Sequence, residues 1–139
     1  MPFVLDASVT MAWCFADEST PYTQSVLKML EETHAEVPAL WHLEVANVLA
    51  VNERKGRITA PVADEFLKML ADLDIRTERR SATVNAPELM FLIRLHGLTA
   101  YDVAYLEIAK RRGFPLATLD AELIQAASNE GVNVAALTR

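Results

Sequence analysis

Residues 3–8 read Phe3-Val4-Leu5-Asp6-Ala7-Ser8, a short apolar run that ends in an acid. Three consecutive apolar residues are typical of a strand that is buried on both faces, as in a parallel sheet covered by helices. In open α/β sheets, ligands bind outside the carboxyl ends of the strands, where the next helices begin. This stretch therefore predicts a helix-covered parallel sheet and, at Asp6, the position of a site.

The rest of the chain alternates short apolar runs with longer amphipathic runs. After the strand at 3–5, strands are predicted at 36–39, 74–79, 115–118 and 132–137. Helices are predicted at 7–16, 21–33, 41–55, 61–73, 87–96, 100–112 and 121–129, the fourth with Phe66, Leu67, Leu70 and Leu73 on its buried face. Strands separated by helices or helix pairs imply a mostly parallel sheet covered on both faces. We expect an α/β fold in three layers, with about five short strands flanked by helices.

Length and composition limit the possible classes of protein. The chain has 139 residues, 52% of them hydrophobic, which suits one domain spanning residues 1–139. No apolar run is long enough for a membrane span, and the single cysteine, Cys14, fits a reducing cytoplasm. The net charge of −6 argues against a protein that holds nucleic acid by bulk charge alone.

Four acids occupy strand ends and helix starts. Asp6 and Asp120 each follow a predicted strand, and Glu44 and Asp102 lie in the first turns of predicted helices. Each acid alone could be a helix cap or a partner of a helix dipole. Asp6, Glu44 and Asp102 have apolar neighbours, however, which a solvated cap does not require. Converging carboxylates repel one another unless a cation neutralises them, and hard oxygen ligands in this number select Mg²⁺ or Mn²⁺.

Three polar residues are placed to support these acids. Asn47 follows Glu44 by three residues and so lies on the same helical face. Ser8 and Thr118 each lie two residues from an acid of the cluster, Asp6 and Asp120 respectively, and could orient it. Each could equally belong to a cap or a turn.

Four segments of the chain, in order, resemble the motifs of PIN-domain ribonucleases, and within that family those of the VapC-type toxins of bacterial and archaeal toxin–antitoxin pairs. The segments are Asp6-Ala7-Ser8, Glu44-Val45-Ala46-Asn47-Val48-Leu49, Thr99-Ala100-Tyr101-Asp102-Val103-Ala104-Tyr105 and Ala117-Thr118-Leu119-Asp120. The resemblance extends from Phe3 to about Leu137. No single motif decides it, but four in the right order on an alternating fold are specific.

This resemblance implies a PIN-like fold and an endoribonuclease that hydrolyses RNA phosphodiesters. The site would consist of the four acids around one or two Mg²⁺ or Mn²⁺ ions, with the three polar residues in supporting positions. Asp6 and Asp102 would be the most dependable ligands, and Glu44 and Asp120 would act partly through water. The resemblance also implies a homodimer and inhibition by a cognate VapB-like antitoxin, whose C-terminal segment wraps the toxin and approaches the site.

An acidic protein would still have to hold RNA. Three basic clusters, at 54–57, 79–80 and 110–112, are candidates for this contact. The first and third clusters end predicted helices, where cations also complement the helix dipole. The residues alone do not place any of the three beside the acids.

Other functions are compatible with a similar fold. A PIN-domain nuclease could have a housekeeping role in RNA processing, or the fold could be a catalytically idle binding protein, although all four acids are present. A signalling receiver that accepts a phosphoryl group on an aspartate fits less well. Receivers pair two acids after the first strand and place a lysine after the last, whereas Ala7-Ser8 follows Asp6 and residues 132–139 contain no lysine.

Overall fold

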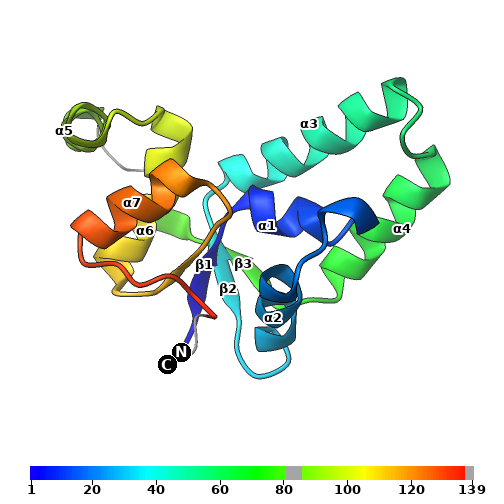
Figure 1. Ribbon diagram of the computed structural model, residues 1–139, viewed down its shortest axis with the longest axis horizontal. Helices are drawn as coiled ribbons and strands as arrows, with labels where there is room; N and C mark the ends of the chain where they lie inside the picture. Colours follow the sequence, from blue (N-terminus) through cyan, green and yellow to red (C-terminus); the bar gives the residue numbers. More distant parts are fainter. Residues whose placement is uncertain (81–85, 137–139) are drawn as a thin grey trace.

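The computed structural model describes residues 1–80 and 86–136. At its centre lies a sheet of four short strands in the order β3-β2-β1-β4 (Figure 1). The strands are β1 (Phe3–Leu5), β2 (Ala35–Val37), β3 (Ile75–Thr77) and β4 (Leu116–Ala117). Each strand pairs with its neighbours in parallel. The predicted α/β class is therefore confirmed, and the arrangement is PIN-like.

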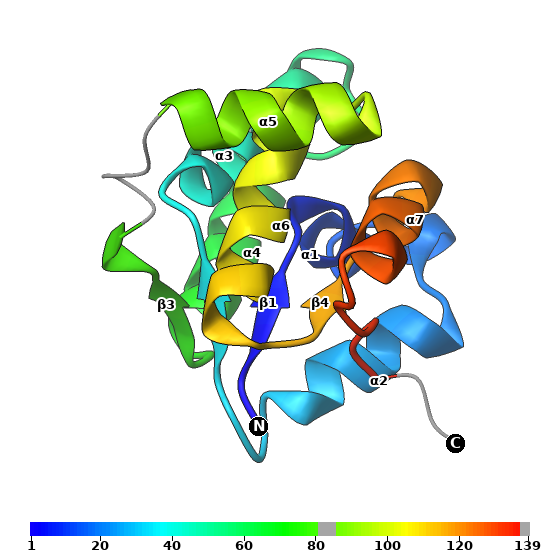
Figure 2. The ribbon, with the colours of Figure 1, turned by 90° about the vertical axis from the view of Figure 1, so that its left-hand side faces the viewer.

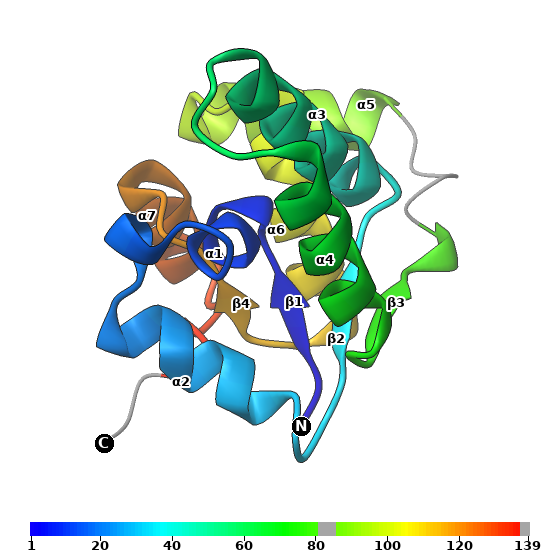
Figure 3. The ribbon, with the colours of Figure 1, turned by 90° about the vertical axis from the view of Figure 1, so that its right-hand side faces the viewer.

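Helices cover both faces of this sheet. Figure 2 shows α5, α6 and α7 on one side, and Figure 3 shows α1 to α4 on the other. Their bounds are α1 Ala7–Ala12, α2 Pro21–Met29, α3 Leu40–Arg54, α4 Ala60–Ala71, α5 Ala86–His96, α6 Ala100–Arg112 and α7 Ala121–Asn129, with a short 3₁₀ helix, η1, at Ala16–Glu18. Within residues 1–80 and 86–136, no helix is long and apolar enough to cross a membrane.

Local sequence signals explain where several helices begin and end. Thr20 caps α2 through a reciprocal pair of bonds with Thr23, and Pro21 then occupies the first helical turn, where its missing N–H costs nothing. Thr99 caps α6 by accepting from the amide of Asp102. Gly113 ends α6 in the left-handed conformation, with φ 68°, which glycine adopts without steric strain.

The central strand β1 is completely buried. Phe3, Val4 and Leu5 are fully buried, as the continuous apolar run predicts for a strand covered on both faces. Helix α6 packs on β1 and contributes a buried face that includes Tyr105 and Leu106. Asp6 directly follows β1 and therefore lies at the carboxyl edge of the sheet, where β4 also ends.

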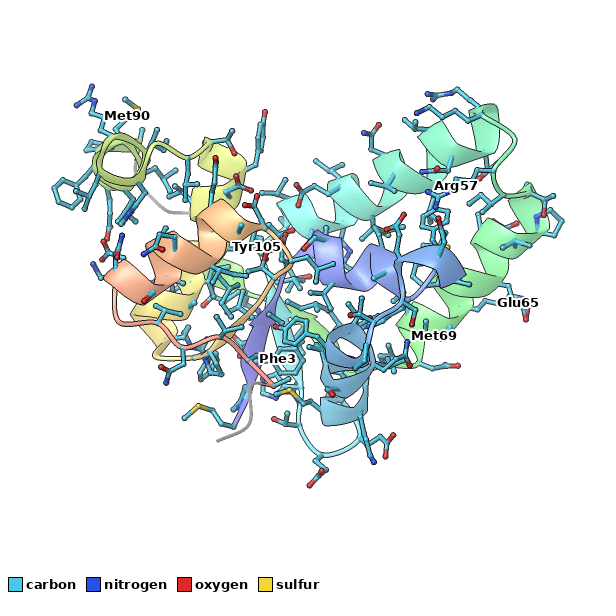
Figure 4. All side chains as sticks on the ribbon, viewed as in Figure 1. Phe3, Arg57, Glu65, Met69, Met90 and Tyr105 are labelled. Atoms are coloured by element: carbon cyan, nitrogen blue, oxygen red, sulfur yellow. The ribbon has the colours of Figure 1, made fainter. Side chains whose placement is uncertain are left out.

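The predicted helix at 7–16 is shorter than expected. Helix α1 ends at Ala12, and Phe15 adopts an extended conformation before η1. Tertiary contacts account for this break. The Trp13 indole donates to the carbonyl of Thr23 at 2.8 Å, and Phe15 is buried with the guanidinium of Arg57 4.2 Å above its ring. Arg57 is labelled in Figure 4.

The predicted last strand, at 132–137, is also wrong in extent. Leu116 donates to Asn133 and accepts from Ala135, each at 2.9 Å, which makes one isolated parallel bridge beside β4. Ala136 then takes a positive φ of 65°, so the backbone turns out of the extended conformation. The sheet consequently has four strands rather than five, and residue 137 lies outside the described ranges.

One predicted core position in α4 is wrong. Phe66 and Leu70 are buried, but Leu67 is 45% exposed. Leu67 follows Phe66 by one residue, which is about 100° of rotation around the helix axis. The two side chains therefore cannot both point from the centre of the narrow apolar face of α4 into the core. Leu73, just past the end of α4, is partly buried against the core.

Candidate functional site

Asp6 lies at the end of β1 and at the start of α1, and it is 7% exposed. Its side chain does not cap α1, so the cap interpretation is wrong for this residue. Instead Oδ2 accepts hydrogen bonds from the hydroxyls of Ser8 and Thr118, both at 2.7 Å. Burial raises the pKa of Asp6, and the two hydroxyls lower it by a smaller amount.

Thr118 therefore acts on a different acid from the one expected. Its position in the sequence associates it with Asp120, but its hydroxyl donates to Asp6 and accepts from the backbone amide of Asp120 at 3.1 Å. Ser8 also accepts from the amide of Leu119 at 3.1 Å. These two hydroxyls thus tie the end of β1 to the loop after β4, which brings Asp6 and Asp120 to one edge of the sheet.

Glu44 reaches the same region from α3. Because α3 begins at Leu40, Glu44 stands at the start of the second turn rather than in the first. Burial raises the pKa of Glu44, as do the charges of Asp6 and Asp102, while a hydrogen bond from Tyr105 lowers it. Asn47 is exposed on α3, and its side chain makes no hydrogen bond within the described ranges.

Asp102 lies in the first turn of α6, where its amide donates to Thr99 at 3.2 Å. The pKa of Asp102 is raised by burial and by repulsion from Asp120, Asp6 and Glu122. Glu122 was not anticipated as part of this cluster. Its position two residues after Asp120, in the first turn of α7, is the signal that could have indicated it.

Asp120 does cap a helix. Its Oδ1 accepts from the amides of Glu122 and Leu123 at 2.9 and 3.2 Å, at the start of α7. The cap interpretation is therefore right for this acid. Capping does not remove it from the cluster, since its charge still raises the pKa of Asp102.

The acids of the cluster affect one another electrostatically across four elements of the fold. Asp6 and Asp102 both raise the pKa of Glu44, and Asp120 raises that of Asp102. Within the residues described, no three acids stand close enough in this structure to hold one ion between them. The donor atoms are carboxylate oxygens, which suit a hard divalent cation. Such a cation would also relieve the repulsion, and the residues present therefore fit Mg²⁺ or Mn²⁺.

Arg57 of the first predicted basic cluster and all three cations of the third are engaged in ion pairs. Arg57 binds Asp17 at 2.8 Å and Glu18 at 3.1 Å, which fastens the turn after α3 to η1. In the third cluster, Lys110 pairs with Glu130. Arg111 pairs with Glu78 and Glu107, and Arg112 pairs with Glu36 and Glu78. The third cluster lies at the end of α6 opposite Asp102, so it does not surround the acids.

The raised pKa values predict how stability depends on pH. In the metal-free protein, the pKa values of Asp6, Glu44 and Asp102 are higher in the folded state than in the unfolded chain. Between the ordinary and the raised pKa values, the folded state therefore binds more protons than the unfolded chain. The contribution of these acids to the free energy of unfolding should therefore fall as pH rises from the ordinary carboxyl range through the raised pKa values. Urea unfolding from about pH 4 to about pH 8 in chelator measures this. The double variant Asp6→Asn/Asp102→Asn should show a flatter dependence than the wild type; parallel curves would contradict the raised pKa values.

The chain therefore has a PIN-like α/β fold with a cluster of acids at the carboxyl edge of its four-stranded parallel sheet. The chain is similar to Ribonuclease VapC3 of Pyrobaculum aerophilum, with 29% identity over 125 residues, 90% of this chain and 94% of that protein. It is also similar to the crystal structure of PAE2754 from Pyrobaculum aerophilum, with a TM-score of 0.66 and 25% identity over 91% of this chain and 79% of that chain. No family model matches the chain. The resemblance to VapC-type PIN-domain proteins is confirmed by these two similarities.

Proposed function

We propose that the protein is an endoribonuclease that depends on Mg²⁺ or Mn²⁺ and acts as the toxin of a toxin–antitoxin pair. The observation that carries the proposal is that Asp6 and Asp102 both repel Glu44, and that Asp120 and Asp6 repel Asp102, in a partly buried site. Such repulsion is costly unless the acids serve a cation. The similarity to a protein named Ribonuclease VapC3 supports RNA as the substrate.

The chemistry assigns distinct roles to the chain's own residues. Asp6, Glu44, Asp102 and Asp120 would hold one or two ions. When bound, a divalent ion acidifies water for attack on a phosphodiester and stabilises the charge that develops. Ser8 and Thr118 orient Asp6, and the amides at the start of α7 orient Asp120. No protein nucleophile is required, and burial raises the pKa of Cys14, which disfavours its thiolate.

Metal-dependent cleavage of RNA is the experiment that tests this function. The purified protein should cut single-stranded RNA in the presence of Mg²⁺ or Mn²⁺, and chelator should abolish the cleavage. Cleavage that persists in chelator would contradict the metal role. An absence of cleavage with either ion would favour the idle binding protein. A housekeeping nuclease would cut RNA but would not arrest growth when expressed without a partner, whereas a toxin would.

A cognate VapB-like antitoxin is the proposed inhibitor, and the cytoplasm is the proposed location, where RNA and a reduced Cys14 would both be found. The antitoxin is expected to bind over the acidic site. A basic segment would suit that site, because the cluster of carboxylates is uncompensated without an ion. If a small reading frame adjoins the gene, coexpression of its product with this protein, followed by cleavage assays, tests this pairing.

A second copy of the chain is the proposed occupant of the outer face of α5. Phe91 and Leu95 are 63% and 58% exposed and lie one helical turn apart, and Met90 lies beside them on the outer side of the helix (Figure 4). Exposed apolar patches of this kind usually mark interfaces. Phe91→Glu should therefore convert a dimer to a monomer in sedimentation equilibrium, with little change in the melting temperature of the monomer. Glu88→Gln on the same helix is the control. A wild-type monomer at all concentrations would contradict this assignment.

A further inference from the structure

Tyr105 is a buried residue of α6 whose hydroxyl donates a hydrogen bond to Oε1 of Glu44, 61 positions away in the sequence. We propose that Tyr105 is a positioning residue, which holds the Glu44 carboxylate at the acidic cluster so that it can serve the divalent ion. This inference rests on the proposed function, because it concerns the ion that the acids would bind.

The bond joins elements that the site must keep together. Tyr105 follows Asp102 by three residues, so both side chains lie on one face of α6. Glu44 belongs to α3, which lies on the other side of the sheet (Figures 2 and 3). Burial and the hydrogen bond to Glu44 raise the pKa of Tyr105, and the backbone amide of Ala7, next to Asp6, also interacts with the Tyr105 oxygen and opposes this shift by a smaller amount. One hydroxyl therefore connects the parts of the chain that supply three of the four acids.

Electrostatics explain why Glu44 needs such a bond. Asp6 and Asp102 both repel the Glu44 carboxylate, and Glu44 is only partly buried, so a free side chain could rotate away into solvent. The Tyr105 hydroxyl opposes this rotation by binding Oε1. Among the described residues, Oε2 of Glu44 makes no hydrogen bond, so this second oxygen would be the one to bind an ion.

Packing alone does not explain the hydroxyl. The ring of Tyr105 is 1% exposed, and a phenylalanine would fill the same space. A buried hydroxyl stabilises a fold only when it has a partner, and its partner here is an acid of the cluster. Tyr101, one turn earlier on α6, is 63% exposed and shows how differently a tyrosine of this helix can be placed.

The test is a double-mutant cycle on Mn²⁺ affinity, measured with the metal alone by electron paramagnetic resonance titration. Tyr105→Phe should weaken Mn²⁺ binding by about tenfold or more, as loss of a residue that orients a metal ligand commonly does. In a Glu44→Ala background, Tyr105→Phe should change the affinity by less than about twofold, because the residue it positions is gone. Tyr101→Phe is the matched control and should leave Mn²⁺ affinity unchanged.

The outcomes separate this inference from the proposed function. Equal losses in both backgrounds would show that Tyr105 acts through the fold and would overturn the positioning role. Wild-type affinity in Tyr105→Phe would overturn it as well, while leaving metal-dependent RNA cleavage intact. A wild-type protein that neither binds Mn²⁺ nor cleaves RNA would overturn the proposed function, and this inference with it.

A second measurement does not depend on the variant folding. A crystal structure of the wild-type protein soaked in Mn²⁺ should show Glu44 at the ion with its Oε1 still bound to the Tyr105 hydroxyl. An ion held by Glu44 after that hydrogen bond has broken would overturn the inference. An ion held by the other acids, with Glu44 turned away, would overturn it too.

Discussion

Asp6→Asn is expected to lower RNA cleavage at least about a hundredfold and, at the same time, to stabilise the metal-free protein. A bound ion contributes several kcal/mol of transition-state stabilisation, and each loss of about 1.4 kcal/mol slows a reaction tenfold. The substituted asparagine would be a neutral and weaker ligand at the most buried position of the cluster, where Asp6 is 7% exposed. Most of that contribution should therefore disappear.

The gain in stability has a separate cause. The pKa of Asp6 is raised, so the folded protein disfavours its ionised form near neutral pH. An asparagine has no charge to desolvate, and its side-chain oxygen can still accept from Ser8 and Thr118. We therefore expect the free energy of unfolding of Asp6→Asn, measured in chelator at neutral pH, to be higher than that of the wild type.

Single-turnover RNA cleavage with Mg²⁺ and urea unfolding in chelator together measure both effects. Asp64→Asn is a suitable control, because Asp64 is exposed on α4 and remote in sequence from every acid of the site. It should change neither quantity. An Asp6→Asn protein that cleaves RNA at the wild-type rate would refute the site assignment, and one that loses both activity and stability would show that the charge of Asp6 is needed for folding.

Arg111→Ala is expected to produce the largest loss of stability. Arg111 binds Glu78 at 3.0 Å and Glu107 at 2.8 Å, and the side chains of these glutamates are 3% and 5% exposed. Removing the Arg111 guanidinium leaves the negative charges of two buried carboxylates less fully neutralised. Breaking a buried ion pair from one side commonly costs about 3–5 kcal/mol. Arg112 also contacts Glu78, at 3.2 Å, and so we expect a value near about 3 kcal/mol.

Urea unfolding at neutral pH measures this loss, with Arg94→Ala as the control. Arg94 is exposed on α5, and no ion pair to it occurs among the described residues. It should change the free energy of unfolding by less than about 0.5 kcal/mol. If Arg111→Ala behaved like Arg94→Ala, the interpretation of the 110–112 cluster as structural would be wrong, and an RNA-binding role for Arg111 would have to be reconsidered.

Much of the fold could be predicted from local patterns. The apolar run at Phe3–Leu5 indicates a strand covered on both faces, and Thr99 with Gly113 marks the limits of α6. The end of α1 could not be predicted in this way. It depends on Trp13 reaching Thr23 and on Phe15 packing under Arg57, which are contacts between distant segments.

The residues of the site likewise fall into those that sequence patterns indicate and those that only the tertiary structure shows. Asp6, Glu44, Asp102 and Asp120 can be identified by sequence, because strand ends and helix starts meet at one edge of a parallel sheet. Their binding of metal stays a prediction. Tyr105 and Glu122 were missed as partners of these acids, since an ordinary apolar helix pattern explains the first and an ordinary helix start explains the second.

The sequence by itself determined the alternation of strands and helices and the location of the acids, because both follow from residues that are neighbours along the chain. Tertiary structure alone decided which hydroxyl holds which acid and which cations are available. The Thr118 hydroxyl donates to the carboxylate of Asp6 rather than to that of Asp120, and Arg111 forms ion pairs with Glu78 and Glu107. These pairings depend on how the helices cross the sheet, and hydrogen bonds and ion pairs form only between groups that packing brings within about 3 Å.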